Sequence, residues 1–431
     1  MELLTIALPF LKVIGAFCLM LLGIRNRLGL ALSILAGGLF MGLIFGLTTT
    51  VLLKTCGLAL VQEKFLFLVA IVGSILILSD ALERSGQSVR LMDALSGYLV
   101  RPRLRLIFFP ALIGLLPMPG GAIFSAPMVK AVSADMSLAN EDKVVINYWF
   151  RHVWEMAWPL YPGIILTVAL ADIPITAYIA RSWPGIVAMF VIGWFFFLRA
   201  GVLNTVMLGV ENGLRAGTGR GGRRKVATEG LPLIIAIVGA IGLETLLEGF
   251  APNIAFEWGV ISALIGAVVC VMVQNRLGLD FIITVLKKRS LWTMLMVIAA
   301  IFIFKDVMQA AGIVEAMAKS AGGGVALFAA AVFLPFLVGM VAGINVAFVG
   351  ATFPLLIGLL QSLGMEHQLV PYLILGSFSG FTGVMISPIH ICFVLTCNYF
   401  ETDLARAWRR LVAPSICFGL SGALLFWFLL G

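Results

Sequence analysis

The segment LSDALERSG at residues 78–86 recurs as FKDVMQAAG at residues 304–312, which places Asp80 on Asp306. Two further matches follow in the same order: GAIFSAPMV (121–129) with VAFVGATFPLL (346–356), and MAWPLYPGIIL (156–166) with MISPIHICFVL (385–395). Three ordered matches at a nearly constant offset indicate an internal duplication. The sequence therefore divides into three parts: a first repeat at 1–200, a linker at 201–230 and a second repeat at 231–431.

The composition places both repeats in a lipid bilayer. The 431 residues are 61% hydrophobic and only 12% charged, with a mean hydropathy of +1.10. A soluble domain carries about a quarter charged residues, and a disordered chain carries even more charge and less apolar surface. The apolar runs are long and continuous, which predicts helices rather than the short alternating strands of a membrane barrel. We expect an all-α membrane protein with about ten transmembrane helices.

Each repeat contains one apolar run that is too short to cross the bilayer twice. These runs lie near 104–135 and 325–363, and both are interrupted by glycine or proline. We predict that each forms a re-entrant helical hairpin, which leaves five spans per repeat. An odd number of spans inserts the second repeat upside down relative to the first. The predicted fold is thus two inverted-topology repeats, each with five spans and one hairpin.

The basic residues test this topology. Following the predicted spans, 22 of the 29 lysines and arginines fall on one side, which the positive-inside rule identifies as cytoplasmic. Both termini and the second hairpin then face outward, and the first hairpin opens to the cytoplasm. The predicted cytoplasmic loops are 83–103, 130–143, 199–230, 275–290 and 398–409.

The same charge pattern bears on partners. The net charge of +8 comes from these short loops, so it gives no reason to expect nucleic-acid binding. The basic linker is either a flexible connector or a contact for anionic lipid. Cys392 and Cys397 have no histidine or second cysteine pair at metal-ligand spacing, so we expect small core residues and no metal site.

The segments LLPMPGGAIFSAPMV (115–129) and NYWFRHVWEMAWPLYPG (147–163) carry a resemblance to a known group. With the inverted repeats and paired hairpins, the chain resembles the ion-transporter superfamily of secondary carriers. It looks most like the integral membrane branch described as domain of unknown function 401, over essentially its whole length. The resemblance implies transport of carboxylates, sugar acids or cations by a homodimer in which a fixed scaffold holds two moving units. The serine-asparagine-threonine hairpin signature of the dicarboxylate branch is absent, so the substrate is not implied.

The hairpins supply the first set of candidate substrate-binding residues. Broken helices at membrane depth are tolerated where they line a cavity, and exposed N–H groups at helix starts bind anions. Alternatively, the glycines merely allow close helix packing. The candidates from the two hairpins are Gly120, Gly121 and Ser125 in the first, and Asn345 and Thr352 in the second.

The fifth apolar run of each repeat supplies the second set. SFSGFTGVMISP (377–388) is rich in hydroxyl and glycine residues, which predicts an unwound segment, although the hydroxyls could instead bond back to their own helix. Its counterpart contains ionisable residues at membrane depth, where they are costly and usually functional. The candidates here are Ser377, Ser379 and Thr382 for substrate, Ser387 for the coupling ion, and Asn147, Arg151, His152 and Glu155 in the counterpart.

Arg151 and Glu155 are the most informative of these residues. Four positions apart, they would share one face of a continuous helix, where they could neutralise each other. Arg151 could instead pair a substrate carboxylate with two hydrogen bonds, while Glu155 or His152 carries a coupling proton.

These residues favour a transporter in the cytoplasmic membrane of a bacterium or archaeon. We expect symport of a small organic anion, such as a carboxylate or sugar acid, driven by protons or sodium and with no bound cofactor. A sodium/proton antiporter without organic substrate is the alternative. No motif of a membrane protease, zinc hydrolase or ATP-driven pump is present, so we expect no enzymatic activity.

Overall fold

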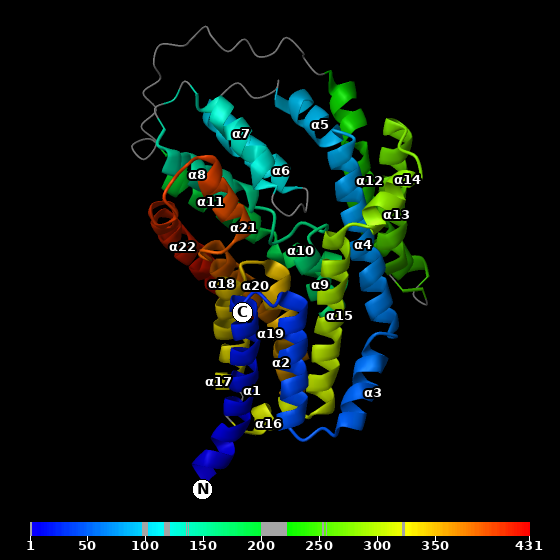
Figure 1. Cartoon of the computed structure of the whole chain (residues 1–431), viewed down its shortest axis with the longest axis vertical. Coiled ribbons are helices and arrows are strands. Elements are labelled where there is room, and N and C mark those ends of the chain that lie inside the picture. Colours follow the sequence, from blue (N-terminus) through cyan, green and yellow to red (C-terminus); the bar gives the residue numbers. More distant parts are fainter. Residues whose placement is uncertain are drawn as a thin grey trace.

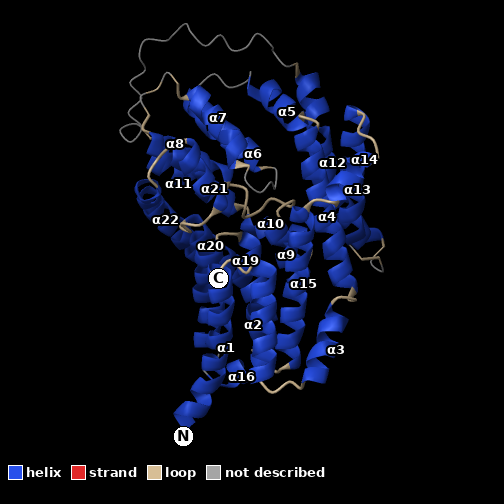
Figure 2. Cartoon of the chain, viewed as in Figure 1, coloured by secondary structure: helices blue, strands red, loops and turns tan. Residues whose placement is uncertain are grey.

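The computed structural model describes residues 2–96, 102–115, 121–134, 136, 138–199, 222–251, 254–255, 257–320 and 324–431. These residues form helices joined by loops and contain no β-strand (Figure 2). Nine helical segments of the described chain are long and apolar enough to cross a membrane. The protein is therefore an all-α membrane protein, as the sequence predicts.

The helices follow the same order in both repeats. The first repeat contains α1 (Glu2–Arg25), α2 (Leu30–Ile44), α3 (Thr49–Ala59), α4 (Glu63–Arg84), α5 (Gln87–Ser96), α6 (Pro102–Gly114), α7 (Ala122–Val132), α8 (Asn140–Arg151), α9 (Pro162–Ala171), α10 (Ile175–Ser182), α11 (Pro184–Gly193) and the π-helical turn η1 (Trp194–Leu198). The second contains α12 (Arg223–Phe250), α13 (Glu257–Asn275), α14 (Asp280–Leu286), α15 (Arg289–Ala310), α16 (Ile313–Ser320), α17 (Gly324–Phe328), the π-helical turn η2 (Ala329–Phe333), α18 (Leu334–Ala342), α19 (Asn345–Ser362), the 3-10 turn η3 (Glu366–Gln368), α20 (Leu369–Met385), α21 (Ile391–Tyr399) and α22 (Leu404–Leu430).

The repeats exchange packing partners. In the first repeat, α4 packs against α13 of the second, and α15 of the second packs against α2 of the first. The shorter helices also pack against the other repeat: α5 contacts α12, and α16 contacts α1. Each repeat thus completes its core with helices from the other.

Two side-chain pairs at the ends of α4 and α15 show how the repeats are oriented. Asp80 near the end of α4 forms an ion pair with Lys288, the residue before α15. Asp306 near the end of α15 accepts a hydrogen bond of 2.5 Å from the amide of Gln62, the residue before α4. Gln62 and Lys288 are related by the same offset as Asp80 and Asp306, so the two contacts are equivalents. The end of each helix meets the start of the other; hence α4 and α15 run antiparallel, as an inverted repeat requires.

Each predicted hairpin corresponds to helical arms that pack against each other, and their re-entrant course stays a prediction. The first, hairpin one, consists of α6 and α7; the second, hairpin two, consists of α17, η2 and α18 followed by α19. In Figure 1, α6 and α7 lie in the upper part of the view, whereas α16 and α17 lie in the lower part. Hairpin two turns at Gly343, whose φ of 66° is costly for residues with a Cβ. Its second arm is longer than we expected, because the 18 residues of α19 are enough to cross a membrane.

The linker is shorter than the sequence predicts. Helix α12 already begins at Arg223, inside the predicted linker at 201–230. Residues 200–221 lie outside the described part of the chain, so the choice between connector and lipid contact stays a prediction.

Candidate functional site

Two interrupted helices define the centre of the molecule. The first break, residues 152–161, separates α8 from α9, and the second break, residues 386–390, separates α20 from α21. Each contains a proline, Pro159 or Pro388, which removes a backbone donor and cannot continue a helix. The sequence predicts both interruptions but misplaces their starts.

The starts of the breaks correct two predictions. Arg151 is the last residue of α8, and the chain continues in turns through Glu155, so the two residues do not share a face of a continuous helix. In the second repeat, α20 stays helical through Ser379 and Thr382 and ends only at Met385, so the expected unwinding there is wrong. In both cases the helix ends at the nearest point where other groups satisfy its backbone, rather than at the most polar stretch.

Aromatic side chains fix the first break against hairpin one. The indole of Trp154 donates to the carbonyl of Ala111 at 2.6 Å, and that of Trp158 donates to Leu115 at 2.9 Å. The hydroxyl of Tyr161 donates to the carbonyl of Gly114 at 2.5 Å. These carbonyls belong to the end of α6, where no helical donor remains for them. The first break therefore completes the end of α6, and the two segments are held together.

The guanidinium of Arg151 faces the start of α7. Arg151 is 3% exposed, and its Nη1 lies 3.4 Å from Nε2 of His152. Gly121, the residue before α7, leaves the space that the guanidinium fills, because a Cβ at this position would lie 2.7 Å from Nη2. The start of α7 in hairpin one and the cation at the end of α8 thus lie at the same place.

Hairpin two reaches the first break from the other repeat. The amide of Asn345, the first residue of α19, donates a hydrogen bond to the carboxylate of Glu155. The backbones are also close, because a Cβ on Gly163 at the start of α9 would lie 3.2 Å from the Cβ of Asn345. Within the described residues, no group donates to Oδ1 of Asn345, which is buried.

The second break meets the first through Tyr148 and two histidines. The Tyr148 hydroxyl lies 3.2 Å from Nδ1 of His390, and the imidazole rings of His152 and His390 are 4.8 Å apart. Ser387 lies beside the turn of hairpin two, where a Cβ on Gly343 would be 3.0 Å from its hydroxyl oxygen. Among the described residues, no partner for this hydroxyl is present.

The structure therefore gathers part of the predicted site. The residues that come together around the two breaks and the hairpin starts are Gly121, Arg151, His152, Glu155, Asn345 and Ser387. We name this group the junction site. Asn147 lies one turn earlier on α8 and holds neighbouring helices, donating to Ala122 at 3.4 Å and to Thr396 at 3.2 Å. Gly120 lies outside the described residues.

The remaining hydroxyl candidates bond elsewhere. Thr352 and Thr382 each donate to the carbonyl four residues earlier, at 2.7 Å. The alternative predicted for 377–388, in which hydroxyls bond back to their own helix, therefore describes Thr382, and Thr352 does the same in hairpin two. Ser125 donates to the carbonyl of Ala122 in its own helix, whereas Ser377 accepts from the hydroxyl of Tyr178 and Ser379 donates to the carbonyl of Val332, both in other helices. Ser379 and Thr382 line an apolar groove between α18, α20 and α22 instead of the junction site.

A comparison with protein families decides the relationship of the chain. The family model described as "Protein of unknown function (DUF401)" matches residues 13–207 and 251–429. The chain belongs to this family. No curated protein matches it. The two matched segments of the DUF401 chain cover most of the two repeats, and the unmatched stretch, 208–250, contains α12 and most of the predicted linker.

One buried carboxylate of the DUF401 chain was missed by the sequence analysis. Glu244 lies in α12 and is fully buried, and its Oε1 accepts a hydrogen bond of 2.8 Å from the backbone N–H of Ile175. This contact caps the start of α10 and connects it to a helix of the other repeat. A carboxylate inside the apolar run at 231–249 was a signal that could have identified it.

An open cavity of about 470 Å³ runs along the second half of α19. Its polar lining includes Lys64, Asp172, Lys305, Glu315 and Gln361, and Lys64 pairs with Asp172 at 2.6 Å. The part of the cavity wall that α19 forms begins at Pro354. This residue lies nine positions after the start of α19, or about 14 Å along the helix axis. The cavity thus lies along the end of α19 that the sequence predicts to be outward, away from the junction site.

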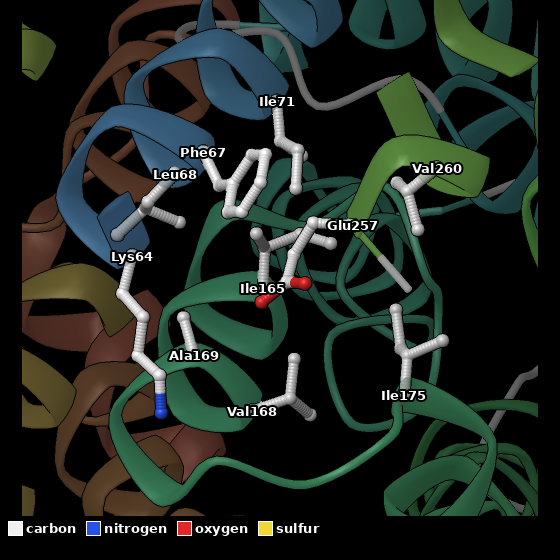
Figure 3. A pocket seen from close by; sticks show the side chains of 10 residues that line it. All are labelled: Lys64, Phe67, Leu68, Ile71, Ile165, Val168, Ala169, Ile175, Glu257 and Val260. Atoms are coloured by element: carbon white, nitrogen blue, oxygen red, sulfur yellow. The ribbon is translucent and has the colours of Figure 1, made fainter. Parts of the chain in front are cut away.

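A second cavity is too small for a substrate. It lies between α4, α9, α10 and α13, has a volume of about 20 Å³, and has room for about one water molecule. Figure 3 shows its ten lining side chains, of which only Lys64 and Glu257 carry charge. This thin apolar gap separates α9 from the long helices α4 and α13.

Proposed function

We propose that the protein is a secondary active transporter that moves a small organic anion by proton- or sodium-coupled symport. The observation that supports this most strongly is the position of Arg151, a buried cation at the meeting point of hairpin one and the first break. An ionisable residue at this depth is costly unless it has a function or a compensating charge. Binding of an anionic substrate during transport, without chemical conversion, would give Arg151 such a function.

The surroundings of Arg151 suit an anionic substrate. The guanidinium is planar and can make two parallel hydrogen bonds to a carboxylate, which lysine cannot. It lies beside the start of α7, where the helix dipole is positive and backbone N–H groups lack helical partners. These features favour carboxylates and sugar acids over neutral or cationic substrates.

Glu155 is the group that we propose to bind the coupling ion. It sits between the two repeats and is held by Asn345 at the start of hairpin two's second arm. Binding of a proton or a sodium ion would change the charge that Arg151 experiences and therefore its affinity for an anion. We propose His152 and Ser387 as the accompanying groups of the coupling site.

The architecture supports alternating access. The junction site lies between two hairpins from opposite repeats, and a polar cavity lies farther along α19 on one side of it. A rocking movement of the hairpins and broken helices against α1–α4 and α12–α15 would open the site first to one side and then to the other. We propose a homodimer in the cytoplasmic membrane of a bacterium or archaeon, with both termini outside.

The alternative function is sodium/proton antiport without an organic substrate. The contact between Glu155 and Asn345, together with the nearby Ser387 hydroxyl, offers the oxygen ligands that sodium needs. A buried arginine beside these ligands is unfavourable for a bare cation, so we rank symport first.

A binding panel tests the proposal. Purified protein is heated in the presence of succinate, citrate, lactate, gluconate and amino acids, each with and without sodium. A ligand at 100 times its Kd stabilises the folded state by about 2.7 kcal/mol, which shifts the unfolding temperature measurably. We expect a carboxylate to produce this shift in the parent protein and in Arg181→Gln, which removes an exposed arginine of α10.

The second half of the test is the loss of this thermal shift in the Arg151→Gln variant. We expect no carboxylate shift in this variant, because the buried cation is absent. If the shift is equal in Arg151→Gln and the parent, or if sodium alone stabilises the parent and no anion does, anion symport is wrong.

A further inference from the structure

Three metal-ligating side chains meet where the two breaks touch. His152 comes from the first break, His390 ends the second break, and Cys392 lies in the first turn of α21. Their ligand atoms all lie within 4.8 Å of one another, and the three residues are 1%, 5% and 4% exposed. We propose that they form a binding site for a thiophilic transition-metal cation such as Zn²⁺. This site shares His152 with the proposed coupling site, but its test by metal binding requires no transported substrate and does not depend on transport.

The hydrogen bonds of His152 prepare it to bind a metal. Its Nδ1 lies 2.6 Å from the carbonyl oxygen of Tyr148, which can only accept, so Nδ1 carries the hydrogen. Nε2 then presents a lone pair, in agreement with its position 3.4 Å from Nη1 of Arg151, which can only donate. A histidine that donates one N–H to a backbone carbonyl and directs the other nitrogen at a metal is the usual arrangement around bound metals.

His390 is oriented in a similar way. Its Nδ1 lies 3.2 Å from the hydroxyl of Tyr148, which also lies 3.3 Å from the carbonyl oxygens of Val384 and Met385. This contact engages Nδ1 and leaves Nε2 as the remaining ligand atom of His390. Tyr148 thus holds both histidines, one through its backbone and one through its side chain.

The ligand set determines which metals fit. One thiolate and two imidazoles suit Zn²⁺, Cu⁺ and their analogues Co²⁺ and Cd²⁺, but not Mg²⁺ or Ca²⁺, which prefer oxygen. Three protein ligands leave the fourth tetrahedral position for water. Cys392 releases its proton to the solvent when the metal binds, so one positive charge of a divalent ion is neutralised.

Arg151 competes with the metal. The Nε2 atom of His152 has one lone pair, which accepts from the guanidinium of Arg151 or the thiol of Cys392, or else binds a metal. The guanidinium must therefore turn away before a cation enters, and its charge also repels that cation. Metal binding would then connect the two breaks and hold the two repeats in one arrangement.

Cobalt titration tests the site in the full-length protein in detergent. After treatment with a chelator, Co²⁺ is added and the near-ultraviolet absorption that arises only from a Co–S bond is recorded. We expect this band in the parent and in Cys397→Ser, a matched control because Cys397 is buried in the same helix but is not part of the cluster. We expect it to be absent in Cys392→Ser, and Zn²⁺ to displace it in the parent.

The histidines and Arg151 give opposite predictions. His152→Gln and His390→Gln should each weaken Co²⁺ binding more than about a hundredfold, because each removes a direct ligand. Arg151→Gln should tighten it about tenfold, since a competing cation is removed. Absence of the Co–S band in the parent, or its persistence in Cys392→Ser, would overturn the proposal.

X-ray absorption of Zn²⁺ bound to the parent protein needs no variant. One sulfur at about 2.3 Å and two nitrogens at about 2.0 Å are expected. Zinc coordinated without sulfur refutes the site even if a variant fails to fold.

Discussion

Replacement of Gly121 by alanine should weaken anion binding at the junction site without unfolding the protein. Gly121 adopts an ordinary right-handed helical conformation, with φ −53° and ψ −15°, so alanine is not strained there. The added Cβ would lie 2.7 Å from Nη2 and 3.0 Å from Nε of Arg151, whereas ordinary contacts begin at 3.4 Å. The guanidinium must therefore retreat by about 0.7 Å, which a flexible side chain can do at small cost.

The displaced guanidinium should bind its anion less well. A shift of this size breaks the alignment of one of the two hydrogen bonds to a carboxylate. A hydrogen bond to a charged group contributes about 1.5–3 kcal/mol. The Kd should therefore rise about tenfold to hundredfold, since each 1.4 kcal/mol corresponds to about a factor of ten.

The assay is calorimetric titration of the carboxylate that gives the largest thermal shift in the panel. Gly73→Ala in α4 is the matched control, because nothing lies within 4 Å of its added Cβ, and it should bind like the parent. Gly114→Ala is the opposite case, because its Cβ would overlap the backbone carbonyl of Arg151, and this variant should fail to fold. A folded Gly121→Ala protein with the parent's Kd would refute the proposed role of Arg151.

Three further predictions concern transport and topology. Arg151→Lys should reduce uptake into proteoliposomes strongly and Arg151→Gln further, because lysine cannot form the planar two-point pair; normal uptake in both would make Arg151 purely structural. Glu155→Gln, which mimics the protonated carboxyl, should retain substrate exchange but lose accumulation under an imposed pH gradient without sodium; if the parent also fails to accumulate there, proton coupling is wrong. In a background without native cysteines, Arg220→Cys and Glu366→Cys should react with an impermeant reagent from opposite sides of the membrane, and labelling from one side would contradict the predicted topology.

The sequence predicts most of the fold because the repeat is visible in local patterns. The matched positions of Asp80 and Asp306 identify equivalent helices, and prolines mark both interrupted spans. The partners of these carboxylates, Lys288 and Gln62, are not predictable in the same way. They depend on packing between segments of different repeats, far apart in the chain, which periodicity does not encode.

The junction site is predictable only residue by residue. Arg151 and Glu155 stand out because ionisable groups in apolar runs are costly, but nothing local indicates that Asn345 binds Glu155. Cys392 follows His390 by two positions in the sequence, but it appears as a core residue until folding brings His152 to the same place. The error for Thr382 is of another kind: a hydroxyl in a helix can bond to its own backbone, so polarity alone does not place it at a site.

The exchange of helices between the repeats has a consequence for biosynthesis. The ribosome completes α2 and α4 long before α13 and α15, the helices that cover them, have been made. Domains of most large proteins fold one after another as they emerge, but here the N-terminal half has no finished core of its own. Helices α2 and α4 therefore stay exposed to lipid in the bilayer until translation has passed the end of α15 at Ala310, after which α13 and α15 can pack against them.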